Sequence, residues 1–334
     1  MSVLYITENG IKIGINGGVV QVTKDNEILQ TVPKETIDSI FIFGNAQMTT
    51  QCTKFCLERK VHVSYHSMSG KYFGCLHSVG NVNVKRLKTQ VFLSEDTDFP
   101  LEISKKIIEA KINNQLVVGK RYLRNSSAIM EEQIFQISNS RKKAKGAKSI
   151  EQLMGYEGIA SRNYFEILSE VIDKDFKFSG RNRRPPSDPF NAMLSFGYTM
   201  IMNEIYGILE SRGLNPFVGF LHQDKEKHPT LASDIMEEWR PVIVDSVVMS
   251  LIQGHEISIN DFYYNEETGA CLFKKDAMKI FLEKMEKKMR CEVKYLDYIV
   301  GETDFRHAIW HQIGLFIKAL ENNCPEEYIP FKIR

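Results

Sequence analysis

The chain has 334 residues, of which 43% are apolar and 25% are charged, and its formal net charge is +1. This composition is typical of a globular protein large enough for two domains, and it argues against a uniformly basic nucleic-acid-binding protein. Apolar runs stay well below the roughly 18 residues that a membrane-spanning helix needs, and the first residues lack the pattern of a signal peptide. The sequence therefore predicts a cytoplasmic protein.

Residues 1–95 predict a small, mostly β domain. Short apolar segments alternate with turn residues, and the pair Asn9-Gly10 is typical of a two-residue hairpin between its flanking strands. Another hairpin is expected around Ser69-Gly70. The remaining expected elements are strands at 19–23, 27–32 and 38–43 and a helix at 47–59. Because nothing here has the spacing of an active site, we expect this domain to act as a scaffold and in dimerisation.

Six cysteines are dispersed along the chain, unlike the dense framework of a small disulfide-rich secreted domain, so reduced thiols are expected. Cys52 and Cys56, with Cys75 and His77 downstream, could be interpreted as zinc ligands. A C-x3-C pair followed by C-x-H is a weak match to the spacing of zinc sites. A helix would instead bury Cys56 in the core.

Residues 96–334 predict a larger helical domain that begins after a polar break at 95–100. The expected helices lie at 101–124, 127–138, 155–168, 188–211, 243–252, 277–290 and 304–320, with a small hairpin at 262–272. The fold class is therefore α+β, with a small N-terminal mostly-β domain followed by a larger all-α domain.

Basic residues are concentrated in two parts of this helical region. Residues 104–148 hold eleven Lys and Arg against three acidic residues, and 141–148 alone holds five basic residues. An irregular loop at 174–189 carries Arg181, Arg183 and Arg184, whose guanidinium groups suit phosphate oxygens. A charge run is usually a solvated surface, but these segments are candidates for DNA contact, and the three arginines are the better candidates.

The stretch 217–241 has the ligand chemistry of a divalent cation. His222 follows a short apolar run, and Asp234 and Glu237 are three residues apart on an expected helix, so both carboxylates share one face. Carboxylates suit Mg²⁺ and Mn²⁺, and an imidazole shifts the preference toward Mn²⁺. The alternative is a surface helix with scattered acidic residues and an incidental histidine.

A second carboxylate lies in the helix expected at 155–168. Glu157 is followed on the same face by Ala160, Ser161 and Tyr164, and small side chains leave room for a ligand to approach the carboxylate. The alternative is an acidic residue in the first helical turn that complements the helix dipole.

Three blocks in order, YEGIASRNY, NAMLSFGY and GFLHQD…LASDIMEEWRP, resemble the CRISPR-associated protein one family of adaptation integrases and endonucleases. The resemblance implies that Glu157, His222 and Glu237 bind the catalytic Mg²⁺ or Mn²⁺. It also places Asn191 beside the metal pocket, with Asp234 and Tyr164 as supporting residues. His228 and Thr230 depart mildly from the family pattern, which often has a basic residue and a serine before the last helix.

The resemblance further implies a metal-dependent enzyme that inserts captured DNA fragments into a CRISPR repeat array by attack of a 3′-hydroxyl on a phosphodiester. The expected partners are DNA, a second copy of the chain and the CRISPR-associated protein two. One alternative is a stand-alone metal-dependent nuclease acting on branched or single-stranded nucleic acid. Another is a binding module without catalysis, which would leave the convergence of the three ligands unexplained.

Overall fold

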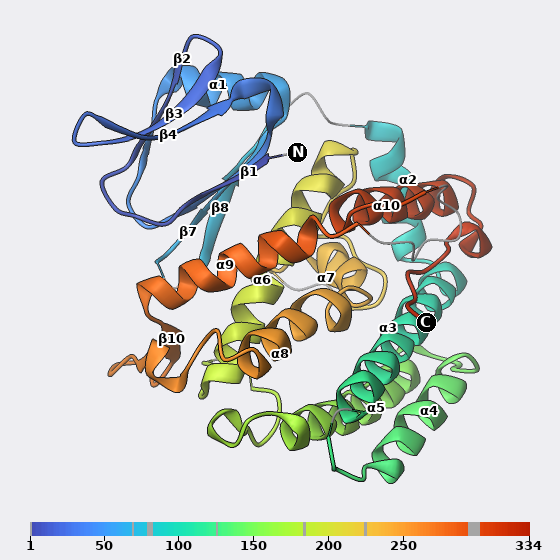
Figure 1. Ribbon diagram of the computed structural model, residues 1–334. Coiled ribbons are helices and arrows are strands. Elements are labelled where there is room, and N and C mark those ends of the chain that lie inside the picture. The colour runs from blue at the N-terminus through green and yellow to red at the C-terminus, as the bar shows by residue number, and fades with distance from the viewer. Residues whose placement is uncertain are drawn as a thin grey trace. The chain divides into compact units, whose positions relative to one another are not determined.

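The computed structural model describes residues 2–68, 70–78, 83–124, 126–182, 185–223, 226–292 and 301–334. The chain divides into two compact units, Met1–Val82 and Asn83–Arg334 (Figure 1). The sequence analysis placed the junction near Glu95, whereas helix α2 (Val84–Ser94) belongs to the second unit by its contacts. The β-rich first unit and the largely helical second unit confirm the predicted α+β class.

The first unit contains two four-stranded sheets, in the orders β1-β5-β7-β8 and β4-β3-β2-β6. The strands of the first sheet are β1 (Ser2–Ile6), β5 (Ile37–Phe43), β7 (His62–His66) and β8 (Tyr72–Leu76). Those of the second are β2 (Lys12–Asn16), β3 (Val19–Lys24), β4 (Glu27–Pro33) and β6 (Gln47–Met48), with helix α1 at Thr50–Arg59. The predicted hairpin of β7 and β8 is confirmed by their antiparallel pairing.

The predicted hairpin at Asn9-Gly10 is wrong, because β1 and β2 belong to different sheets. Gly10 has a φ of +77°, as a tight turn requires, but its N–H donates to the Asn45 carbonyl at 2.9 Å. The Asn9 side chain accepts from the Asn45 N–H at 2.8 Å. The turn is therefore fixed to another loop and redirects the chain from one sheet to the next.

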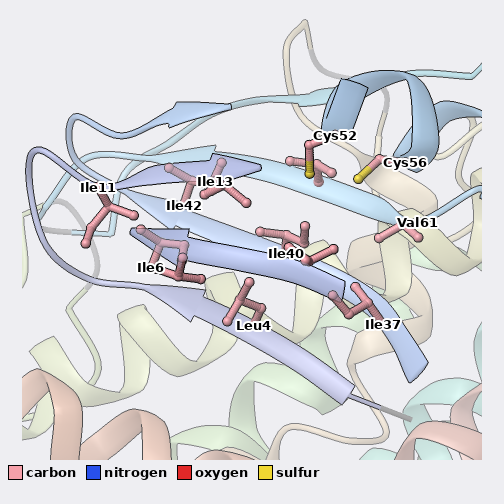
Figure 2. Packing of buried hydrophobic residues seen from close by; sticks show 13 residues of the cluster. Leu4, Ile6, Ile11, Ile13, Ile37, Ile40, Ile42, Cys52, Cys56 and Val61 are labelled. Carbon is pink, nitrogen blue, oxygen red and sulfur yellow. The ribbon is translucent and has the colours of Figure 1, made fainter. Parts of the chain in front are cut away.

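The core of the first unit is built from the inward faces of both sheets and of α1. Ile13, Ile40 and Ile42 belong to one buried cluster with the α1 cysteines, Cys52 and Cys56 (Figure 2). Both cysteines are fully buried and free of disulfides. The burial of Cys56 is what a helix at this position predicted.

The second unit consists mainly of helices, together with a short hairpin of β9 (Phe262–Tyr264) and β10 (Cys271–Phe273). The helices after α2 are α3 (Asp98–Leu123), α4 (Glu131–Ala144), α5 (Ile150–Val171), α6 (Pro189–Ser211), α7 (Thr230–Met236), α8 (Ser246–Gln253), α9 (Lys275–Met289) and α10 (Phe305–Glu321). Helices α3, α4 and α5 pack together, and α3 also contacts α7 (Figure 1). Along the described part of the chain, no helix is both long and apolar enough to cross a membrane.

Local sequence signals explain where several of these helices begin. The side chains of Ser149, Asp188 and Asp304 accept the backbone N–H three residues on, which caps α5, α6 and α10. Pro189 follows its cap as the first residue of α6, where the missing N–H costs nothing. Caps of this kind fix the start of each helix, and so fix which side chains face the interior.

Two predicted details of the helices differ from the structure. Glu157 is not in a first turn, because α5 begins at Ile150, so the helix-dipole interpretation does not apply to it. The helix predicted at 243–252 begins with a π-helical turn, Pro241–Asp245, that continues into α8. The last residue of this turn is Asp245, whose side chain is buried. π-Helical turns are frequent near functional sites.

Candidate active site

Helices α3, α5 and α7 bring two carboxylates to a single ammonium group. Lys111 of α3 contacts Glu157 of α5, and its Nζ lies 2.6 Å from Oε2 of Glu237, the C-cap residue that follows α7. The Lys111 and Glu237 side chains are 7% and 3% exposed. Ser161, one turn after Glu157, donates to Oε1 of Glu157 at 2.7 Å. The two glutamates expected to bind one cation therefore do converge, with a lysine between them.

Asp234 fixes His222 beside these carboxylates. Its buried carboxylate accepts the backbone N–H groups of Phe220, Leu221 and His222 at 2.7, 3.0 and 3.2 Å. It also lies 2.6 Å from Nδ1 of the His222 ring. With Nδ1 facing a carboxylate, the neutral ring carries its proton there and keeps a lone pair on Nε2. Nε2 lies 3.8 Å from Oε1 of Glu237, so this nitrogen is near one of the two glutamates.

Arginines complete the positive side of the site. Arg240 pairs with Oε1 of Glu237 at 2.9 Å. The guanidinium groups of Arg240 and Arg181 lie 4.9 and 5.3 Å from the ring centre of Tyr198. The Tyr198 hydroxyl in turn donates to buried Asp245 at 2.5 Å. Both guanidinium groups therefore lie near the Tyr198 ring, and Asp245 of the π-helical turn fixes the orientation of that ring.

A cavity of about 800 Å³ is lined by Lys111 and Glu157, whereas His222 lines a separate pocket. The polar wall of the cavity also includes Arg181 and Arg240, and part of its lining is apolar. The apolar lining residues are Met130, Phe165, Phe178 and Pro241. A concave site of this size, with a few convergent charged groups, has the dimensions of a ligand-binding pocket.

The electrostatics keep both glutamates ionised. Burial by itself would raise the pKa of Glu237, but the charges of Arg240, Lys111 and His222 outweigh it and lower that pKa to about 2. Burial also opposes ionisation of Glu157, yet the Lys111 ammonium lowers its pKa. Both carboxylates are therefore charged at neutral pH and able to bind a cation.

The pKa of His222 lies above that of a free imidazole. Burial opposes its charged form, but the hydrogen bond to Asp234 and the charges of Asp234 and Glu237 raise its pKa. A proton therefore competes with a metal for Nε2 more strongly than it would in a free imidazole.

The other predicted residues lie around the cluster in different roles. Tyr164 is fully buried and donates to Asp245 at 2.9 Å, so it supports the wall of the cavity. Asn191 accepts from Arg181 at 2.7 Å and from the Asn182 N–H at 3.2 Å, and thus positions Arg181. Arg181 is half-buried and lines the cavity. Arg183 and Arg184 lie outside the described residues.

Sequence analysis missed Lys111, Arg240 and Asp245. A signal existed for Lys111, because a charged residue next to Ile112 and after Ile107-Ile108 falls among the apolar positions of α3. Arg240 lies three residues after Glu237, the spacing of neighbours on a helix surface. Nothing in the sequence pattern singles out Asp245.

The donor set fits a divalent cation. Two ionised carboxylates and an imidazole whose Nδ1 is fixed by an acid are the oxygen and nitrogen ligands of Mg²⁺ or Mn²⁺ sites. As the described side chains stand, however, no three His, Cys, Asp or Glu residues are grouped closely enough to hold a metal ion. The Lys111 ammonium contacts both Glu157 and Glu237.

Comparison with known proteins identifies the family. Residues 4–287 match the family model described as CRISPR associated protein Cas1. The CRISPR-associated endonuclease Cas1 of Mycobacterium tuberculosis is 31% identical over 330 residues, which cover 99% of this chain and 97% of the relative.

Two solved structures share the fold. A casposase bound to an integration product has a TM-score of 0.84 and 24% identity, over 97% of this chain and 91% of the casposase. A chain of a Cas6-RT-Cas1–Cas2 complex has a TM-score of 0.85 and 24% identity; all of the present chain is covered, but it spans only 36% of that longer chain. The predicted family is confirmed: the chain belongs to the Cas1 family of CRISPR-associated endonucleases.

Proposed function

We propose that this Cas1-family enzyme performs its chemistry in the cavity beside Lys111, with Glu157, His222 and Glu237 binding the catalytic Mg²⁺ or Mn²⁺. The observation that carries the proposal is that Lys111 contacts both Glu157 and Glu237 and that Nε2 of His222 lies 3.8 Å from Glu237, although the three residues are 65 and 15 positions apart in the sequence. A cation shared by these donors would give their proximity a common purpose.

The reaction proposed is the joining of a DNA fragment to a CRISPR repeat. The 3′-hydroxyl of the fragment attacks a phosphodiester at the repeat end, one phosphorus–oxygen bond forms, one breaks, and the displaced strand leaves with its own 3′-hydroxyl. The attacking hydroxyl gives up its proton, and the departing oxygen takes one. With water as the nucleophile, the same exchange is hydrolysis, the endonuclease reaction.

The protein's own groups stabilise the charge that develops on the phosphate. A bound divalent cation supplies Lewis acidity toward a phosphate oxygen. Arg181 and Arg240 present guanidinium groups from the polar wall of the cavity, where they can pair with phosphate oxygens. Asp234 keeps the His222 ring oriented, so Nε2 stays directed at the reacting centre without reorganisation.

The partners proposed are DNA, a second copy of the chain and a Cas2-type protein, and the cytoplasm is where such substrates are met. We assign the first unit to dimerisation and the helical unit to catalysis. Support for dimerisation comes from the edge strand β4, where Ile28 and Leu29 are 58% and 53% exposed. Support for the Cas2-type partner is the likeness in fold to a chain from a complex that contains Cas2.

The test is joining of a short duplex DNA to a repeat-bearing plasmid in Mn²⁺, with and without the Cas2-type partner. Wild type is compared with Glu237→Ala, His222→Ala and the control Glu256→Ala, an acidic residue that pairs with Lys284 away from the cavity. We expect products from wild type and control and a loss of at least about 100-fold in both site variants, as for removal of a metal ligand or its equivalent. Joining that survives both substitutions would place the metal site elsewhere.

A further inference from the structure

We infer that Lys111 is a counter-cation that competes with the metal, so that a divalent cation binds tightly only when nucleic-acid phosphate enters the cavity. This inference rests on the proposed metal site at Glu157, His222 and Glu237. It adds a regulatory property that the family assignment does not include: metal and nucleic acid bind cooperatively because of one lysine.

The first argument is position. The Lys111 ammonium contacts both Glu157 and Glu237, and its side chain is almost completely buried. A metal bound by these two glutamates must take over the charge interactions that the lysine now makes. In the metal-free protein, Lys111 keeps two buried carboxylates from facing each other without compensation.

The second argument is that helix α3 itself is held in place. The side chain of Asn114, one turn after Lys111, donates to the carbonyl of Glu238 at 2.9 Å and to that of Phe331 at 3.0 Å. Gln115 donates to Ser161 of α5 at 3.0 Å. These bonds tie α3 to both glutamate-bearing segments, so the lysine side chain, and not its helix, has to yield to a metal.

The third argument is the charge count. Glu157, Glu237 and Asp234 contribute three negative charges, and Lys111 and Arg240 contribute two positive ones. Adding a divalent cation gives a net charge of +1 in a largely buried cluster even when His222 is neutral. Such a surplus disfavours the metal until an anion arrives, and a phosphodiester, with its single negative charge, restores neutrality.

The coupling between metal binding and phosphate binding acts in both directions. If phosphate raises the affinity for metal, the metal raises the affinity for phosphate by the same factor. The free protein would therefore hold its metal weakly and avoid hydrolysing DNA without a properly placed substrate.

The experiment measures Mn²⁺ binding to the full chain by electron paramagnetic resonance of free Mn²⁺, with and without a short duplex DNA, after subtraction of binding to the DNA alone. Two variants remove the charge: Lys111→Met keeps the length of the side chain, and Lys111→Gln keeps a donor for the glutamates. Lys111→Arg retains the charge. Lys105→Met is the control, because Lys105 lies on the same helix but pairs with Glu102.

For wild type, Lys111→Arg and Lys105→Met, we expect DNA to tighten Mn²⁺ binding by about tenfold, within the usual range of coupling between sites. For Lys111→Gln and Lys111→Met, Mn²⁺ should bind about tenfold more tightly than to wild type without DNA, and the effect of DNA should fall below about threefold. Circular dichroism verifies that each variant is folded.

Three results would overturn the inference. Mn²⁺ binding that is unchanged or weaker in both charge-removing variants excludes competition by Lys111. An effect of DNA that persists in them assigns the coupling to other residues. If the Glu237→Ala variant binds Mn²⁺ as tightly as wild type does, the proposed metal site itself is wrong, and the inference fails with it.

Discussion

Asp234→Asn is the substitution that tests most sharply how the site is held together. The two oxygens of Asp234 accept two hydrogen bonds each: Oδ2 from the N–H groups of Phe220 and Leu221, and Oδ1 from the N–H and Nδ1 of His222. Asparagine has one oxygen and one amide nitrogen. If the amide nitrogen is turned toward Phe220 and Leu221, two buried N–H groups lose their acceptor. If it is turned toward His222, the ring can accept from it by carrying its proton on Nε2, and only the His222 N–H loses its acceptor.

The magnitude follows from that count. A buried donor left unpaired costs about 1–3 kcal/mol, so one or two such donors cost about 2–4 kcal/mol in free energy of unfolding. For a helical unit of this size, each kcal/mol lowers the melting temperature by about 2–4 °C, so we expect a fall of about 4–16 °C. His222 should lose its fixed orientation at the same time, and joining activity should fall by at least about tenfold.

Differential scanning calorimetry measures the effect, and Asp304→Asn is the matched control. Asp304 also bonds a histidine through two atoms, the N–H and Nδ1 of His307, both at 2.8 Å, but this pair is partly exposed. Asparagine caps a helix about as well as aspartate, so the control should change stability by less than about 1 kcal/mol. Equal melting temperatures for the two variants would refute the role assigned to Asp234.

Three further predictions concern the surroundings of the site. Burial raises the pKa of Glu238 to about 8, so the folded state keeps a proton that the unfolded state loses near 4.5, and stability falls as pH rises between these values. The melting temperature of Glu238→Gln, measured relative to that of wild type at the same pH, should therefore rise between pH 5 and pH 8.5. In Gly219→Ala the new Cβ would lie 2.8 Å from Asp234 Oδ2 and from Thr230 Cβ, which should cost about 1–3 kcal/mol. Chelation with EDTA should abolish joining, and Mn²⁺ should restore it.

Each of these predictions has its own control. A difference in melting temperature between wild type and Glu238→Gln that does not vary with pH would contradict the raised pKa. Gly155→Ala in α5 is the control for Gly219→Ala, since its Cβ meets nothing within 4 Å, and it should stabilise the helix by about 0.5–1 kcal/mol. Joining that continues in excess EDTA would show that the reaction needs no metal.

The elements of the fold were largely predictable, because their signals are local. Periodic apolar residues located the long helices, although the cap Ser149 was not recognised and α5 begins five residues earlier than predicted. The pairing of strands was harder to predict from the sequence. Asn9-Gly10 is a strong local turn signal, yet a turn sequence does not determine whether the strand that follows stays in the same sheet.

The acidic and imidazole residues that we propose as metal ligands were recognisable in the sequence, but the cations around them were not. Glu157, His222 and Glu237 belong to recognisable blocks, whereas Lys111 is 46 residues before Glu157 and reaches the cluster only through the packing of α3 on α5 and α7. Asn191 is the opposite case, because the residue was recognised in the sequence but its contacts could not be predicted. Its hydrogen bonds to Arg181 and to the 180–182 loop depend on tertiary contacts that the sequence pattern does not contain.

The most direct test of the metal site is anomalous diffraction from crystals of the protein with Mn²⁺ and a short DNA duplex. We predict one strong anomalous peak bound by a carboxylate oxygen of Glu157, a carboxylate oxygen of Glu237 and Nε2 of His222, with the Lys111 ammonium moved away from both glutamates. A peak bound instead by Asp245, or one remote from the cavity, would contradict the assignment of these three residues as the metal ligands.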